Sequence, residues 1–323
     1  MSLPSLDAVE AAADIVYRRL PATPQICWPL LAERLGCELW LKHENHAETG
    51  SFKVRGGLVY LDECRDACAQ GVVAATRGNY GQSVGFAARA AGIPAAIVVP
   101  EGNSPDKNRA MRALGVELIT AGSDFDESAR VARELADERG MHLMPSFAMP
   151  LVRGVATYAV ELFRHVAELD RIYVPIGLGS GICAVAAARN ALSPETEIVG
   201  VVAEGASAYL RSFEARAVRT TNAARTIADG LAVRIPNESA LDYGLQNVHH
   251  VVAVLDEAVL QAMGWLYADT HNVAEGAGAA PVAAVALELE ANAGRRVAAV
   301  VTGGNAAAPL FERALATLTQ DPK

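Results

Sequence analysis

The chain has 323 residues, of which 51% are hydrophobic, enough to form a large buried core. At roughly 150 residues per domain, this length predicts about two domains. The 28 basic and 37 acidic residues give a formal net charge of -9, which provides no general attraction to nucleic acid or to an anionic membrane. We therefore expect neither as a partner, and any anionic ligand must be held by a local arrangement of groups.

The five cysteines form an odd and sparse set with no C-x-x-C pair, which indicates neither a disulfide framework nor a zinc knuckle. Cys64 and Cys68 could share one face of a helix and bind a metal, but no second pair or histidine cluster accompanies them, so free thiols are favoured. The N-terminus lacks the basic and apolar stretches of a secretory signal, and no apolar run approaches the roughly 18 residues of a membrane span. These features predict a cytoplasmic protein.

From Glu38 onward, short β-branched runs alternate with longer amphipathic stretches, which predicts an α/β fold with βα units and largely parallel sheets. Strands are predicted over residues 38–42, 72–76, 95–99, 117–120, 171–176, 197–203, 250–254 and 297–302. Helices are predicted over residues 58–68, 81–91, 106–113, 124–139, 152–169, 182–191, 257–269, 281–293 and 306–318.

No linker or charge block marks a domain boundary, so the order of the elements must indicate it. A compact β-α-β-α-β-α run covers about residues 72–145. We therefore predict a large domain over residues 1–65 and 149–323, with a small domain inserted over residues 66–148. A ligand cleft is expected where the two meet.

A glycine-rich turn follows the strand predicted over residues 171–176, at the edge where ligands of open parallel sheets bind. It has the sequence Gly177-Leu178-Gly179-Ser180-Gly181 and opens a helix of small residues. Such a turn brings several backbone N–H groups and a helix N-terminus to one point, which suits a phosphate. The spacing matches neither the dinucleotide fingerprint nor the Walker pattern, so a monophosphate is the better interpretation. A tight turn of packing glycines is the alternative.

Two further loops contain candidate site residues. Thr76, Asn79 and the free amides of the following helix could hold a carboxylate, because a helix N-terminus favours negative charge; capping by Asn79 is the alternative. Lys53 follows Phe52 in a Gly/Ser turn, where partial desolvation would lower its pKa, as a Schiff-base lysine requires. Taken alone, a lysine at a turn is more often a solvated surface charge.

These three loops, in this order, resemble those of the fold-type II enzymes that use pyridoxal 5'-phosphate (PLP), specifically the serine/threonine dehydratase family in its short form. The match spans nearly the whole chain. Residues 50–57 are similar to the segment whose lysine carries the cofactor, residues 76–82 to the S-x-G-N-H-x-Q loop, and residues 177–181 to the phosphate loop. Residues 23–24, 41–45, 226–230, 275–279 and 301–305 match further blocks. The resemblance implies a fold like that of the tryptophan synthase β chain, with an open, mostly parallel twisted sheet flanked by helices in each domain.

The resemblance also implies residue roles. Lys53 would carry PLP and then act as the general base. Phe52 would lie against one face of the pyridine ring, Asn79 would hydrogen-bond the ring hydroxyl, and Thr302 would face the ring nitrogen. Two sets complete the expected site: Gly177, Leu178, Gly179, Ser180 and Gly181 for the phosphate, and Ser51, Thr76, Arg77, Gly78, Asn79 and Tyr80 for the substrate carboxylate.

The implied reaction is β-elimination of water from a 3-hydroxy amino acid, which yields a 2-oxo acid and ammonia. L-threonine and L-serine are the leading substrate candidates. A neutral hydroxyl at Thr302 moderates the electron sink of PLP, which suits elimination over transamination. The partner is then a small amino-acid substrate, and the family is commonly homodimeric. The regulatory domain of biosynthetic threonine deaminases, and feedback control of that kind, are not expected because the chain ends soon after residue 318.

Three departures from the family pattern bear on these expectations. Arg77 stands where serine racemases have the serine that serves the opposite face of the substrate, so racemisation has no second base. An arginine there could pair with an acidic side chain, indicating 3-hydroxyaspartate, clasp the α-carboxylate, or point outward. Tyr80 replaces the usual histidine and changes the pocket wall, so bulkier β-hydroxy amino acids are alternative substrates. Glu204 matches a cation ligand of some relatives, but Leu210 occupies the position of the aspartate, and no metal is predicted.

Two other functions can be compared with these residues. A β-replacement enzyme such as a cysteine synthase would have valine before the lysine and a T-S-G-N-T loop, which differ from Phe52 and from residues 76–80. A non-catalytic PLP-binding protein would have no physical need for Lys53, Asn79, the 177–181 turn and Thr302 together. Both are therefore alternatives to the dehydratase.

Overall fold

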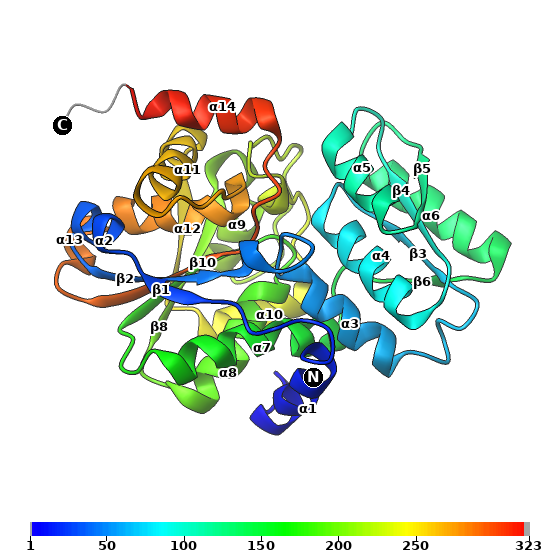
Figure 1. Cartoon of the computed structure of the whole chain (residues 1–323), viewed down its shortest axis with the longest axis horizontal. Helices are drawn as coiled ribbons and strands as arrows, with labels where there is room; N and C mark the ends of the chain where they lie inside the picture. Colours follow the sequence, from blue (N-terminus) through cyan, green and yellow to red (C-terminus); the bar gives the residue numbers. More distant parts are fainter. Residues whose placement is uncertain (1, 320–323) are drawn as a thin grey trace.

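Residues 2–319, which this computed structural model describes, form a six-stranded and a four-stranded sheet (Figure 1). The larger sheet has the strand order β1-β2-β10-β7-β8-β9; β1 pairs antiparallel with β2, and the other neighbours are parallel. Its strands are β1 (Gln25–Cys27), β2 (Glu38–His43), β7 (Arg171–Pro175), β8 (Glu197–Ala203), β9 (His250–Val254) and β10 (Arg296–Val301). The predicted α/β class and largely parallel sheets are confirmed.

Both faces of the larger sheet are covered by helices. In β10, Val297, Ala299 and Val301 enter one core, while Ala298 and Val300 enter the other, because successive side chains of a strand point to opposite faces. The first core includes α2 (Pro29–Leu35), α11 (Asp256–Thr270), α12 (Gly276–Leu287) and α14 (Ala308–Thr317); the second includes α1 (Leu6–Val16), α7 (Met149–His165), α8 (Ser180–Leu192), α9 (Ala208–Ala215) and α10 (Glu238–Asn247). The short α13 (Leu289–Asn292) follows α12. Burial on both faces explains the continuous apolar runs of these strands.

The smaller sheet has the order β5-β4-β3-β6 and is parallel throughout. Its strands are β3 (Val72–Ala75), β4 (Ala95–Val99), β5 (Glu117–Thr120) and β6 (His142–Leu143), and its helices are α4 (Asn79–Ala91), α5 (Pro105–Ala113) and α6 (Phe125–Arg139). The core on one face includes α4 and α5, whereas α6 packs on the opposite face. This lobe lies to one side of the molecule, with α3 (Lys53–Glu63) beside it (Figure 1). The domain boundaries at 65/66 and 148/149 stay predictions.

Several element bounds differ from the sequence prediction. Helix α3 begins at Lys53 rather than near residue 58, so Lys53 is the first residue of a helix and not part of the turn before it. Helix α12 begins at Gly276 and contains Pro281, although proline favours a first turn. Helix α7 ends at His165, four residues early, and the very short β1 and β6 were not predicted because two or three residues show no period.

Glycines hide the start of α3 from sequence inspection, since glycine is a poor helix former. They are needed because neighbouring helices approach closely. A Cβ atom at Gly56 would lie 2.9 Å from the Leu151 carbonyl oxygen, and one at Gly57 would lie 2.3 Å from the Ser83 hydroxyl oxygen. The helix that begins with Lys53 is therefore held tightly against α7 and α4.

A buried ion-pair cluster also fixes this helix. The Arg55 side chain is 1% exposed, and its Nε and Nη1 atoms lie 2.8 and 2.6 Å from carboxylate oxygens of Glu44 and Glu161. The Lys42 Nζ atom lies 2.5 Å from Glu161. Arg55 follows Lys53 by two residues, and the cluster joins α3 to β2 and α7.

Neither a membrane span nor a metal cluster is found in the described part of the chain. None of the described helices is long and apolar enough to cross a bilayer. The cysteines are free thiols, with Cys68 buried and Cys64 half-buried. No group of three or more His, Cys, Asp or Glu side chains within residues 2–319 is placed to hold a metal ion.

Candidate active site

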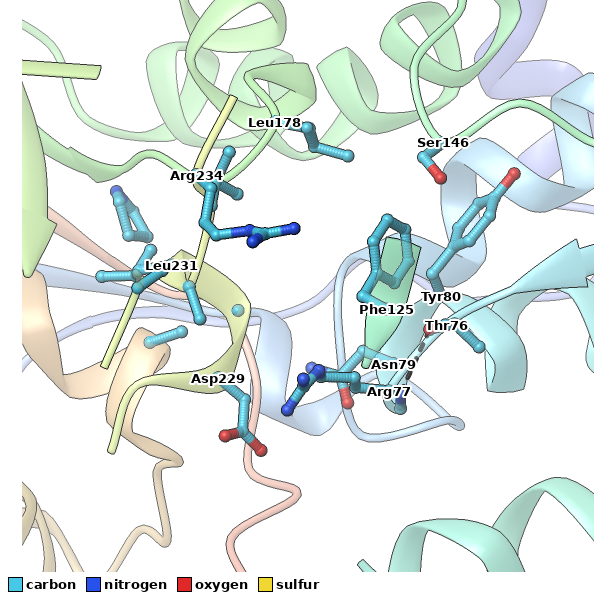
Figure 2. Close-up of a pocket in the computed structure, with 18 of the residues that line it drawn as sticks. Thr76, Arg77, Asn79, Tyr80, Phe125, Ser146, Leu178, Asp229, Leu231 and Arg234 are labelled. Atoms are coloured by element: carbon cyan, nitrogen blue, oxygen red, sulfur yellow. Dashed lines mark hydrogen bonds between the residues drawn. The ribbon is translucent and has the colours of Figure 1, made fainter. Parts of the chain in front are cut away.

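A cavity of about 860 Å³ lies beyond the carboxyl ends of β3, β7 and β10. This is the edge of parallel sheets at which ligands bind. Apart from Ser51, the predicted site residues line it: Phe52, Lys53, Thr76, Arg77, Gly78, Asn79, Tyr80, Gly177, Leu178, Gly179, Ser180, Gly181 and Thr302. Figure 2 shows side chains from both lobes facing this space.

Lys53 is half-buried and reached from the cavity. Burial lowers the pKa of Lys53 to about 8, and the nearby Glu275 carboxylate only partly opposes that effect. Its Nζ atom lies 4.8 Å from the centre of the Phe52 ring. A lysine with a lowered pKa is a nucleophile suited to an aldehyde at near-neutral pH, so Lys53 is not an ordinary surface charge.

The turn at residues 177–181 has free backbone donors. Gly179 adopts φ 105°, a left-handed conformation that favours glycine, and Ser180 begins α8. The first amides of a helix have no partner within it, and no backbone acceptor is found in the described chain for the amides of Gly177, Leu178 and Gly179. A Cβ at Gly177 would lie 2.3 Å from the Gly230 carbonyl oxygen, so the turn is also closely packed. These groups fit a phosphate.

Asn79 is held by side chains from the other lobe. Its Nδ2 atom donates to Glu275 at 2.5 Å, and its Oδ1 accepts from Asn305 at 2.9 Å. Asn79 is the first residue of α4, and the N-cap position is Gly78. No side-chain hydrogen bond caps this helix, so capping by Asn79 does not occur. The Thr76 hydroxyl accepts from the Gly78 amide at 3.1 Å, which orders the loop.

Glu275 is a site residue that the sequence interpretation did not assign. It lines the cavity, it is 6% exposed, and burial raises the pKa of its carboxyl group, partly offset by Lys107 and Asn79. Its local sequence contains a signal, because it is a lone carboxylate in an otherwise small and apolar segment, residues 273–280. Lys107 and Asp229 also line the cavity, and Lys107 lies in an amphipathic helix without any such signal.

Tyr80 and Arg77 present different groups to the cavity. The Tyr80 hydroxyl donates to the Pro145 carbonyl oxygen at 2.5 Å, so its ring, rather than its hydroxyl, is left to form the wall beside Phe125 (Figure 2). Arg77 is exposed, lines the cavity and forms no ion pair with the residues that the structure describes. Its guanidinium points into the space on the Asp229 side (Figure 2).

Thr302 and Ser51 lie where β10 meets the loop before α3. Thr302 is 4% exposed, lines the cavity, and accepts from the Phe52 amide through its carbonyl at 3.1 Å. Ser51 is fully buried behind the wall and pairs with Gly303; its hydroxyl has no hydrogen-bond partner among the described residues. The place of Ser51 in the carboxylate set stays a prediction. Glu204 is exposed and Leu210 is half-buried, some distance along the chain from these loops.

Comparisons with known proteins show the family to which the chain belongs. A family model described as pyridoxal-phosphate dependent enzyme matches residues 18–303. The chain is 33% identical over 311 residues to an L-threonine ammonia-lyase of Thermotoga maritima, covering 95% of this chain and 76% of that protein. It is 29% identical over 307 residues to an L-threo-3-hydroxyaspartate ammonia-lyase of Saccharomyces cerevisiae, covering 94% of each. A solved threonine deaminase from T.th. matches with a TM-score of 0.88 and 34% identity, over 94% of this chain and 99% of that one. The chain belongs to the family of pyridoxal-phosphate dependent enzymes.

Proposed function

We propose that this protein is a PLP-dependent ammonia-lyase that eliminates water from a small 3-hydroxy amino acid to give a 2-oxo acid and ammonia. L-threonine and L-serine are the leading substrate candidates. One observation carries the proposal: a single cavity brings together Lys53, the unbonded amides of residues 177–181 and the Asn79 loop. The names of the relatives support it, because ammonia-lyases and a threonine deaminase are among them.

In this proposal, the residues of the cavity divide between cofactor and substrate. The amides of residues 177–181 would hold the phosphate, Phe52 and Asn79 would contact the ring and its hydroxyl, and Thr302 would offer a neutral hydroxyl to the ring nitrogen. When bound, PLP supplies the electron sink that removal of the α-proton requires. Lys53 would hold the cofactor through its amine, and its Nζ atom is the base available to the α-proton of the substrate.

The start of α4 then binds the substrate carboxylate. The Thr76, Gly78, Asn79 and Tyr80 positions surround a helix N-terminus, which favours an anion. Asn79 cannot rotate freely because Glu275 and Asn305 hold both ends of its amide. The carboxylate is thereby fixed relative to Lys53, which places the α-proton for abstraction.

A panel of hydroxy amino acids tests the proposal directly. We expect the PLP-loaded enzyme to release ammonia and a 2-oxo acid from L-threonine or L-serine. Absence of ammonia from every member of the panel would favour the non-catalytic PLP-binding protein. Faster formation of cysteine from O-acetylserine and sulfide would instead favour the β-replacement enzyme.

A second candidate substrate is 3-hydroxyaspartate, and Arg77 is the observation that favours it. Its guanidinium lines the cavity without an ion pair in the described chain, so it is available to a second carboxylate. We expect Arg77→Met to lower kcat/KM for 3-hydroxyaspartate by roughly 10- to 100-fold, the value of a lost charge-assisted contact. Turnover of L-threonine should change far less. An equal loss for both substrates would assign Arg77 to the α-carboxylate instead.

The lowered pKa of Lys53 predicts how cofactor uptake depends on pH. Burial favours the neutral amine, so the pKa falls to about 8, and the reactive amine predominates above that pH. The rate at which the apoenzyme takes up PLP should therefore rise with pH and level off above pH 8. An ordinary lysine would level off only above about pH 10.4. Stopped-flow absorbance from below to well above the lowered pKa distinguishes the two profiles.

We also propose that the enzyme is a cytoplasmic homodimer that acts on a free amino acid. The absence of a disulfide among the cysteines and the acidic net charge of -9 support the location and the lack of a nucleic-acid or membrane partner. Light scattering of the PLP-loaded enzyme measures the oligomeric state.

A further inference from the structure

Lys107 of α5 forms an ion pair between the two lobes. Its Nζ atom lies 2.7 Å from Asp229 Oδ2, and the side chains are 9% and 51% exposed. Asp229 belongs to the bridging segment, residues 216–237, which joins α9 to α10 and forms no helix longer than one turn. Arg234 of the same segment also pairs with Asp124 and Asp126 of the small lobe, but all three side chains are well exposed to water. Exposed ion pairs contribute little to stability, so the pair that includes the buried Lys107 ammonium is the stronger link between the lobes.

The stem of Lys107 also supports the loop that binds the carboxylate. A Cβ atom at Gly78 would lie 2.7 Å from Lys107 Cδ. The backbone of this loop therefore packs directly on the lysine, and Gly78 immediately precedes Asn79. A displacement of Lys107 would displace the backbone that places Asn79.

Asp229, at the other end of the ion pair, is fixed to the large lobe. The Ile227 amide donates to Asp256 Oδ2 at 3.1 Å. Gly230, the residue after Asp229, packs closely on the phosphate turn. A Cβ atom at Gly177 would lie only 2.3 Å from the Gly230 carbonyl oxygen. The carboxylate of Asp229 is thus placed in a fixed relation to the phosphate turn.

We propose that Asp229 is a positioning residue that, through Lys107, holds the 77–80 loop in register with the phosphate turn and so sets the affinity for the substrate. This inference rests on the proposed function for its substrate. The physical contacts run without a break from Gly177 through Gly230 and Asp229 to Lys107 and Gly78. Asp229 touches neither cofactor nor substrate in this scheme and acts only on the loop.

The unequal exposure of the two side chains makes the proposal testable. Burial lowers the pKa of Lys107, but the Glu275 and Asp229 carboxylates outweigh it, so the ammonium stays charged. Asp229→Asn leaves a buried ammonium without its hydrogen-bonded carboxylate, which is costly unless α5 moves toward water and the loop moves with it. Lys107→Met leaves only a half-exposed carboxylate, which water solvates, and the apolar stem that supports Gly78 is retained.

The experiment measures backbone hydrogen exchange over residues 77–83 in the holoenzyme, together with KM and kcat. We expect Asp229→Asn to accelerate exchange and raise KM by roughly tenfold, with kcat changed less than about twofold. Lys107→Met breaks the same ion pair without leaving a buried charge, so it should change exchange and KM in the same direction but less than Asp229→Asn, and the double variant should return to the level of Lys107→Met. Asp229→Glu should restore exchange toward that of the wild type. Asp106→Asn, which breaks an exposed ion pair with Arg109 on the same helix, is the matched control.

Two results would overturn the inference. One is wild-type exchange and wild-type KM in Asp229→Asn. The other is an equal rise of the exchange rate and of KM in Asp229→Asn and Lys107→Met, with the two effects adding in the double variant. Additive effects are those of two unrelated structural residues. The exchange measurement needs no substrate, so it remains decisive even if the enzyme acts on a compound other than a 3-hydroxy amino acid.

Discussion

Lys53→Ala should lose the visible absorption of lysine-linked PLP and should lose turnover by at least roughly 10³-fold. The reason is that the proposed function gives one amine two tasks, the covalent link to the cofactor and the acceptance of the α-proton. Its lowered pKa, about 8, suits both tasks near neutral pH. The spectrum and the rate of ammonia release from L-threonine or L-serine are the two measurements.

The matched variant is Lys53→Arg, which keeps a positive charge at the start of α3 but cannot form the link at neutral pH. It should be as inactive as Lys53→Ala. Both variants should retain the phosphate turn, so weak non-covalent binding of PLP is expected to persist. Turnover retained in either variant would remove Lys53 from its proposed role.

Arg55→Met should destabilise the protein by about 3–5 kcal/mol, the range for breaking a buried ion pair by removing one partner. The guanidinium is the shared partner of Glu44 and Glu161, and both side chains are nearly inaccessible to water. Without it, two carboxylates would share a buried site with Lys42 as the remaining cation. Urea unfolding monitored by circular dichroism gives the change in free energy.

Arg153→Met is the control for that measurement. Arg153 pairs with Glu63 at the other end of α3, with side chains 26% and 30% exposed, and the loss should be only about 0–1 kcal/mol. If Arg55→Met yields no folded protein, Arg55→Lys keeps the charge while losing the bidentate contact with Glu44, and it should lie between the wild type and the methionine variant. Equal stability of Arg55→Met and Arg153→Met would show that the buried cluster contributes no more than a surface pair.

The sequence predicted the strands and the loops that follow them because both depend on local pattern. The β-branched runs at β8 and β9 match their predicted bounds, and the loops after β3, β7 and β10 line the cavity as expected from parallel topology. The start of α3 was missed because Gly56 and Gly57 obscure the helical pattern, and they are explained only by the close approach of α7 and α4.

The part of the site that could not be predicted depends on contacts between distant segments. Lys107 and Asp229 are 122 residues apart, and although Asp229 lies in the 226–230 block, no local pattern indicates that Lys107 is its partner. Glu275 becomes important only because folding brings it to Asn79, a partner 196 residues away. Ser51 lies behind the cavity wall, so its place in the carboxylate set, which its motif indicates, stays a prediction.

The core beneath the smaller sheet contains residues from outside that sheet's own stretch of chain. Val54, Leu58 and Val59 of α3 and Leu151 of α7 lie in the same buried cluster as Val72 of β3. A fragment limited to residues 66–148 would therefore expose an apolar face that α3 and α7 cover in the whole protein. The two lobes therefore share part of one buried core, and the helix that begins with Lys53 completes the interior of the lobe that presents Asn79.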